Sequence, residues 1–170
     1  MLQSRAEETL RNASHHLIYE YTMSQRISVC YFNVRRPEDW VTSVYLESLL
    51  IHLRYLLHFS YSNKPRDTDI IAQNFFDDPS IWETGRPPIT DDLTEAWGLI
   101  DKKVAHLTYN RTEEEIANIS WATPIIGKVI QERMQFFLNN VPKNRLCTCE
   151  VCQRDLKWLN NITYRLAEPR

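Results

Sequence analysis

Glycine is scarce in this chain, with three residues in 170, whereas average usage of about 7% would place roughly 12 in a chain of this length. Hairpins, bulges and phosphate-cradling loops depend on glycine for positive φ angles. Gly85, Gly98 and Gly127 are scattered and form no G-x-G-x-x-G, G-K-[ST] or G-x-S-x-G motif. The scarcity argues against a sheet protein and against Rossmann, P-loop and α/β-hydrolase chemistry.

The chain also lacks a large excess of charge of one sign, long apolar runs and a leader sequence. Twenty Lys and Arg against 22 Asp and Glu give a formal charge of −2, so no global basic field favours nucleic acid and only a local basic patch could do so. No apolar run reaches the length of about 18 residues that a membrane span requires. The first eight residues lack a basic start followed by an apolar segment. We therefore expect no signal peptide, no membrane association and a cytoplasmic location.

Apolar residues at helical spacing are abundant. Residues 4–31 contain neither glycine nor proline, and the clearest helix, 39–61, places leucines at i, i+3, i+4 and i+7. Further helices are predicted at 67–76, 90–109 and 112–140, the last broken near Pro124, with a final amphipathic piece at 156–164. A loop of about fifteen residues is expected between Asp77 and Pro88. Gly98, inside the 90–109 helix, predicts that this helix packs closely on the 39–61 helix.

These segments predict an all-α fold, an antiparallel helical bundle of about five helices with a short Cys-containing C-terminal tail. One core is expected for a chain of this length. Residues 1–142 form the predicted bundle domain, and residues 143–170 form a C-terminal extension that packs on it.

The first candidate site is a polar stripe on the 39–61 helix. Glu47, Ile51, Arg54 and His58 follow one another at i, i+4, i+7 and i+11, so they lie on one side of the helix beside the leucine face. Charge-assisted hydrogen bonds between Glu47 and Arg54 are expected there, and the imidazole of His58 suits acid/base work. The alternative interpretation is a structural seam that sets the register of the helix.

The second candidate site lies on the 90–109 helix and just beyond it. His106 is predicted to face partly inward, with Asp101 and Lys102 at the rim and Arg111 at the end of the helix, where the dipole favours a cation. Antiparallel packing of this helix on the 39–61 helix would bring His106 towards Arg54 or Glu47 in one cleft. A lone histidine at helical spacing is otherwise a satisfied core residue.

The two polar segments together resemble small bacterial helical proteins of the HEPN-like type. The resemblance covers residues 4–140 and is carried by Glu47-x4-His52-Leu53-Arg54-x3-His58-Phe59 and Asp101-Lys102-Lys103-x-Ala105-His106-Leu107-Thr108-x2-Arg111. It implies a helical bundle that often dimerises and, in active members, a ribonuclease site of arginine and histidine at the dimer seam. The family's arginine, four to six residues, histidine motif is not matched, because three residues separate Arg54 from His58.

Two functions follow from this resemblance. One is a homodimeric interaction or regulatory module whose Arg/His/Glu cleft binds a phosphate-bearing ligand, RNA or a protein partner. The other is a metal-independent ribonuclease, in which His106 or His58 acts as base or acid on a ribose 2′-hydroxyl and Arg54 or Arg111 holds the scissile phosphate.

The third candidate site is Cys147-x-Cys149-x2-Cys152. Three thiolates this close together can bind Zn²⁺, but a structural zinc site needs four ligands. The fourth ligand would be Cys30, a histidine such as His15 or His16, or a group from a second chain. Three interpretations stay open: a metal site that makes the chain a zinc-stapled binding protein, a disulfide, and free thiols in a reducing cytoplasm, which the incomplete motif favours.

Overall fold

The computed structural model describes residues 5–34, 40–62, 65–86, 88–105 and 113–161, without the side chains of residues 34, 102–105 and 113–121. Six α-helices account for most of these residues: α1 (Glu7–Val34), α2 (Trp40–Tyr61), α3 (Pro79–Gly85), α4 (Asp91–Ala105), α5 (Glu113–Asn140) and α6 (Glu150–Asn161). Two 3₁₀ turns, η1 (Ala72–Phe75) and η2 (Lys143–Arg145), complete the described part, which contains no strand. The predicted all-α helical bundle is confirmed.

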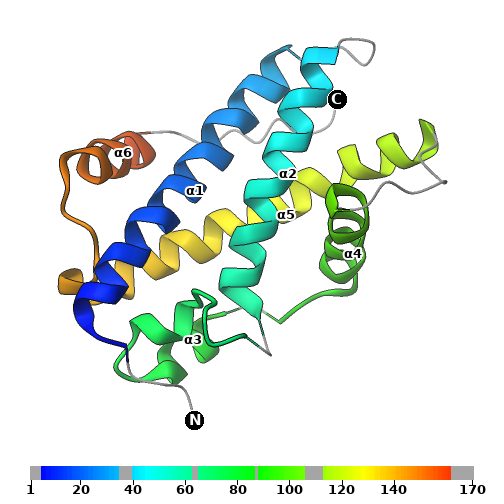
Figure 1. Ribbon diagram of the computed structural model, residues 1–170. Coiled ribbons are helices and arrows are strands. Elements are labelled where there is room, and N and C mark those ends of the chain that lie inside the picture. The colour runs from blue at the N-terminus through cyan, green and yellow to red at the C-terminus, as the bar shows by residue number, and fades with distance from the viewer. Residues whose placement is uncertain (1–4, 35–39, 63–64, 87, 106–112, 162–170) are drawn as a thin grey trace.

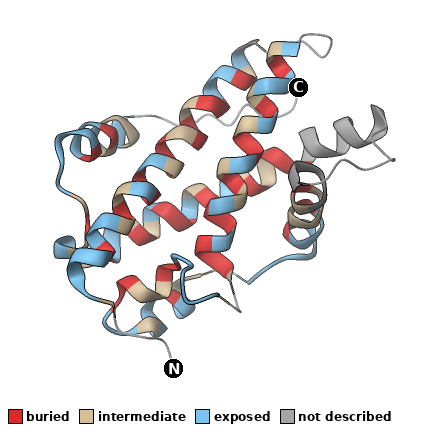
Figure 2. Cartoon of the chain, in the orientation of Figure 1, coloured by how far each residue is buried: buried red, intermediate tan, exposed pale blue. Residues whose placement is uncertain are grey.

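The long helices set the architecture. Figure 1 shows α1 and α2 side by side and antiparallel, with α5 crossing behind both, α4 beside α5, and α6 beside α1. The buried residues lie on the facing sides of these helices (Figure 2), as the apolar spacing in the sequence requires. Among the described residues, no helix combines the length and apolar character needed to cross a bilayer.

The leucine face of α2 is the centre of the core. Leu49, Leu53, Leu56 and Leu57 are each at most 1% exposed, which confirms the periodicity of this segment. Below them lies an aromatic cluster from four different elements, in which the rings of Phe59, Phe75, Phe76, Trp82 and Phe137 contact one another.

The expected loop between Asp77 and Pro88 is wrong, because α3 occupies most of it. Asp78 caps this helix by accepting a hydrogen bond from the Ser80 N–H at 2.9 Å, and Pro79 occupies the first turn. Trp82 then buries its ring, at 1% exposure, and donates from Nε1 to the carbonyl of Ser60 at 3.2 Å. The segment is helical because one buried tryptophan and a good cap compensate for its short length.

Three other expectations are also wrong. The helix predicted at 67–76 is limited to the four-residue 3₁₀ turn η1. The predicted break near Pro124 is absent, since α5 continues through this residue. Gly98 does not mark a close helix contact, because a β-carbon built there would meet no atom of the described residues within 4 Å. The close approach is instead at Gly85, where a β-carbon would lie 2.1 Å from Cζ of Phe136. The end of α3 therefore lies directly against the Phe136 ring of α5, and a larger residue at this position would require that ring to move.

Candidate metal centre and the neighbouring polar cavities

The three cysteines of the C-terminal segment meet a histidine of α1. Cys147 and Cys149 lie between η2 and α6, Cys152 lies in the first turn of α6, and His15 lies in the first half of α1. Nδ1 of His15 is 3.8 Å from Sγ of Cys147, 3.5 Å from Sγ of Cys149 and 3.2 Å from Sγ of Cys152. All four candidate ligand atoms lie within 4.8 Å of one another, so the cluster could hold a metal ion.

Local hydrogen bonds fix this cluster. The backbone N–H of Cys147 donates to Oγ of the fully buried Ser14, at 2.6 Å, which ties the cysteine segment to the residue before His15. The N–H of Gln153 bonds to the carbonyl of Cys149 at 3.0 Å and starts α6. Cys152 is 1% exposed whereas Cys149 is exposed, so the cluster lies at the boundary between core and surface.

The surroundings shift the pKa values of two of the thiols in opposite directions. The backbone N–H of Cys152, followed by the thiols of Cys147 and Cys152 and then by His15, holds the pKa of Cys149 at about 6. Burial raises the pKa of Cys152 far above its ordinary value, and hydrogen bonds with the other two thiols act in the same direction. Cys149 is thus ready to bind a cation as a thiolate, whereas Cys152 stays a neutral thiol unless a bound cation compensates for the charge of its thiolate.

A second anchor holds α6 against α1 beyond the cluster. Nη2 of Arg26 lies 3.0 Å from Oδ1 of Asp155, a residue that is 5% exposed, and the Arg26 guanidinium covers the ring of Trp158 at 4.8 Å. Helix α6 is therefore held against α1 at its first turn and again at Asp155 and Trp158.

The polar stripe of α2 forms a different kind of site. Nε of Arg54 donates to Oδ1 of Asp101 at 2.7 Å, and Nε2 of His58 lies 3.8 Å from the same oxygen. The ring of His58 stands edge-on to Trp97, 5.3 Å between centroids. Glu47 is exposed on α2 and is not among the described residues that line the adjoining cavity. Asp101, which the sequence placed at the rim of the second candidate site, is thus the carboxylate that binds Arg54 and lies near His58, whereas the expected partner of Arg54 was Glu47.

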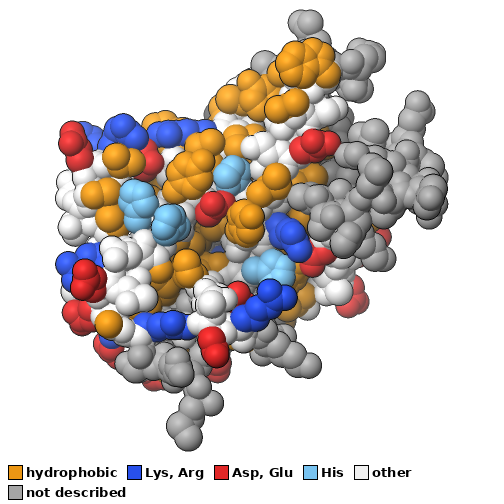
Figure 3. All heavy atoms as spheres, in the orientation of Figure 1, with side chains coloured by type: hydrophobic (Ala, Val, Ile, Leu, Met, Phe, Trp, Pro, Cys, Tyr) orange, Lys and Arg blue, Asp and Glu red, His pale blue; other side chains and the backbone are white. Residues whose placement is uncertain are grey.

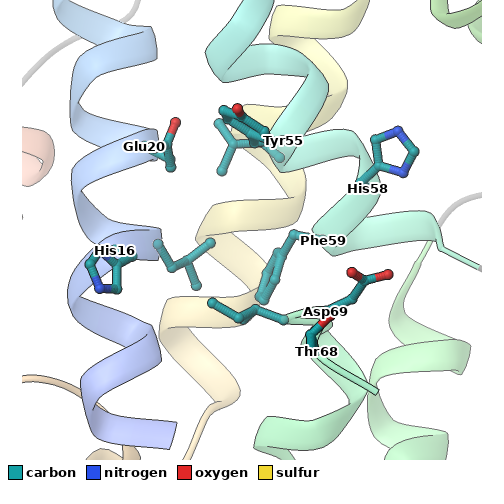
Figure 4. Close-up of a pocket in the computed structure, with 10 residues that line it drawn as sticks. His16, Glu20, Tyr55, His58, Phe59, Thr68 and Asp69 are labelled. Atoms are coloured by element: carbon teal, nitrogen blue, oxygen red, sulfur yellow. The ribbon is translucent and has the colours of Figure 1, made fainter. Parts of the chain in front are cut away.

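Two cavities adjoin this stripe. The larger, about 800 Å³, is lined by residues that include Arg54, His58, Tyr61, Arg66, Ile89 and Trp97. The smaller, about 430 Å³, lies between α1 and α2, where Figure 4 shows His16 and Glu20 on one side and Tyr55, Phe59 and Asp69 on the other. Figure 3 shows basic and acidic side chains interspersed over the face of α1 and α2. Charged side chains therefore line both cavities among apolar ones, without a continuous basic surface around them.

The remaining predicted residues have separate outcomes. His106 and Arg111 lie outside the described residues, and Lys102 lies in α4 with a side chain that is not described. Cys30 is exposed on α1 and His16 lines the smaller cavity, so neither supplies the fourth ligand of the cysteine cluster.

A pair that the predicted sites did not include joins Nδ1 of His52 to Oε2 of Glu20 at 2.6 Å. Local spacing carries no signal for this pair, because it joins one residue of α1 to one residue of α2.

The fold and this cluster together define an all-α protein with a candidate three-cysteine, one-histidine metal centre. The chain matches no known family model, no curated protein and no solved structure. The HEPN-like resemblance therefore stays a prediction, and the geometry of the chain itself is the basis for proposing a function.

Proposed function

We propose that this chain is a zinc-stapled helical binding protein, in which the metal fixes α6 and the segment before it against α1. The observation that carries the proposal is the convergence of His15, Cys147, Cys149 and Cys152 within 4.8 Å. A tetrahedral zinc ion, with Zn–S of about 2.3 Å and Zn–N of about 2.0 Å, separates the sulfur and nitrogen ligands by about 3.5 Å. The three observed S···N distances, 3.2, 3.5 and 3.8 Å, are centred on this value.

The ligand set favours a structural role for the ion. Three thiolates and an imidazole are soft enough to select zinc over magnesium or calcium. Four protein ligands complete a tetrahedral shell and leave no open position for a substrate or a reactive water, unlike catalytic zinc sites. A cluster of reduced cysteines is typical of the reducing cytoplasm, which is where we propose that the protein acts.

Elemental analysis of the purified full chain tests the zinc assignment. We expect one equivalent of zinc per chain, loss of the metal in Cys152→Ser, and full retention in the matched control Cys30→Ser, since Cys30 is exposed and outside the cluster. A wild-type content below about half an equivalent would contradict a structural site. A full equivalent of iron or copper instead would contradict zinc in particular.

A second candidate function belongs to the polar cavity, namely binding of a phosphate-bearing ligand or RNA by a homodimer of HEPN-like type. The observation that favours it is the position of Arg54 and His58, both of which line the 800 Å³ cavity. In its enzymatic form the function is metal-independent RNA cleavage by His58 and His106. Zinc-loaded protein should then cleave labelled RNA in magnesium-free buffer.

Two outcomes would exclude the ribonuclease: no cleavage by the wild type, or equal cleavage by His106→Ala and wild type. Light scattering tests the dimer separately. A particle with the mass of one chain, 20.2 kDa, would contradict it.

A further inference from the structure

The smaller cavity, between α1 and α2, contains none of the four candidate metal ligands. Its volume of about 430 Å³ lies within the range of about 300–1,000 Å³ that is usual for small-molecule sites. Buried apolar side chains form part of its lining, namely Leu17, Leu56 and Phe59. The space therefore suits a molecule whose middle is apolar.

One wall of this cavity carries the carboxylate of Glu20, a residue of α1 whose side chain is 24% exposed. Nδ1 of His52, on α2, lies 2.6 Å from Oε2 of Glu20, and this contact orients the carboxylate. Oε1 has no partner among the described residues. Glu20 is therefore held through one oxygen and can accept a hydrogen bond from a ligand with the other.

The opposite wall carries a second carboxylate, that of Asp69. Figure 4 shows Asp69 across the cavity from Glu20, with the ring of Phe59 between them. The backbone N–H of Arg66 donates to Oδ2 of Asp69 at 2.8 Å, and Oδ1 has no partner in the described part of the chain. No cation of that part lies within 4.0 Å of this carboxylate. Asp69 is thus held in the same way as Glu20, with one oxygen free.

A metal ion is a poor match for these two carboxylates. Within the described ranges, the cysteine cluster is the single group of three or more His, Cys, Asp or Glu residues that converges closely enough to hold a metal. Glu20 and Asp69 therefore do not meet His16 or His58 around one ion, although both histidines line the cavity. Two separated negative groups with apolar surface between them match a ligand that has two separated positive groups.

The remaining polar lining of the cavity is compatible with such a ligand. With histidine neutral, Glu20 and Asp69 are the charged residues of the lining, and both are negative. His16 and His58 would oppose a cation only in their protonated form. Tyr55 is 55% exposed and also lines the cavity, and the face of a tyrosine ring attracts an ammonium group.

We propose that this cavity binds an aliphatic diamine, with one ammonium group on Glu20, the other on Asp69, and the methylene chain over the apolar side chains between them. Carboxylates hold ammonium groups through charge-assisted hydrogen bonds, and burial of the methylene groups adds affinity. The proposal rests on the proposed function in naming a ligand class for a binding protein, but it uses none of the metal ligands. It differs from the second candidate function in the sign of the ligand's charge.

Isothermal titration calorimetry of the purified full chain tests this site, with putrescine, cadaverine and the monoamine butylamine as probes. The buffer is held at about pH 8, where an ordinary imidazole is neutral. We expect saturable binding of a diamine, and binding of butylamine that is weaker by about tenfold or more, because a monoamine contacts one carboxylate at a time. Glu20→Gln and Asp69→Asn should each weaken diamine affinity by about tenfold or more and remove its advantage over butylamine.

The matched control is Asp67→Asn, which removes an exposed carboxylate two positions before Asp69 from a residue that does not line the cavity. This variant should keep the diamine affinity of the wild type. Glu20→Gln also changes the contact with His52. If Glu20→Gln fails to fold, the comparison of Asp69→Asn with Asp67→Asn decides, because both residues are exposed.

Three results would overturn the proposal: no saturable diamine binding by the wild type, equal affinities for the diamines and butylamine, or equal diamine affinities of Asp67→Asn and Asp69→Asn. Zinc content, measured on the same samples, separates this proposal from the proposed function. Stoichiometric zinc without diamine binding would overturn the diamine site alone, and diamine binding by a chain that holds no zinc would contradict the metal centre alone.

Discussion

The cysteine cluster and the α2 stripe are both polar sites beside one core, but they are held in different ways. The cluster unites residues from opposite ends of the chain, with Cys152 at 1% exposure. The stripe joins Arg54 and Asp101, whose side chains are 34% and 39% exposed. An exposed ion pair already satisfies its own charges in water, whereas thiolates brought together at the edge of the core need a bound cation to compensate for their charge. We therefore expect metal removal to affect the fold and removal of the ion pair to affect it little.

The largest expected loss of stability distinguishes substitutions at two adjacent histidines, His15 and His16. His15→Ala should abolish stoichiometric zinc and lower the free energy of unfolding by about 3 kcal/mol or more, because structural zinc binding contributes directly to folding. His16→Ala is the matched control, since His16 is exposed and lines the smaller cavity. Urea unfolding of both variants gives the measurement, and equal stability of the two would contradict a structural role for the centre.

The next effect concerns the second anchor of α6. Arg26→Met leaves the carboxylate of Asp155 without its closest partner and should cost about 1–3 kcal/mol. Arg154→Met is the control, because Arg154 lies 3.4 Å from the same oxygen but is 66% exposed at its side chain. We expect the Arg26→Met penalty to be larger in zinc-free protein. Equal penalties with and without zinc would mean that the two anchors act independently.

A smaller effect is expected at the α2 stripe. Arg54→Met should change the free energy of unfolding by less than about 1 kcal/mol, because the pair with Asp101 is partly exposed. The change should shrink further at high salt, where screening weakens the pair. A loss as large as that of His15→Ala would show that the stripe, and not the metal centre, organises the bundle.

The smallest effect changes reactivity rather than stability. In zinc-free protein Cys149 should stay reactive towards iodoacetamide down to a pH of about 6, the value at which its surroundings hold its pKa. A lowered pKa contributes stability that is present above the pKa of the unfolded thiol and lost as the pH falls through about 6. Free cysteine in the same reaction is the control. Identical pH profiles would mean that the hydrogen bonds from Cys152 and Cys147 to the Cys149 thiolate are not kept in zinc-free protein.

Helical spacing was sufficient to predict the all-α fold and the leucine face of α2. It failed at α3, because a seven-residue helix offers fewer than two turns of periodicity and its main stabilising contact, the burial of Trp82, comes from distant residues. It failed at Gly98 for a related reason, since the sequence does not tell which glycine faces another helix.

The candidate sites show the same limit. The cysteine spacing identified three ligands of the cluster, and His15 was one of several named candidates for the fourth. The choice of His15 depends on the fold of the chain, which brings Cys147 beside Ser14, where the Cys147 N–H donates to Ser14 Oγ. The partner of Arg54 and the two carboxylates of the smaller cavity likewise depend on contacts between distant parts of the chain, which local patterns do not encode.

The position of the metal centre also has a mechanical consequence. His15 and Cys147 are 132 positions apart, so a metal bound there closes almost the whole bundle into one loop. A force applied at the two ends, as during threading into an ATP-driven protease, would pass through the metal–ligand bonds and bypass the core. The chain would then resist extension until those bonds rupture, even if its helices were individually weak. Release of the ion would open that loop and expose the core to the load in a single event.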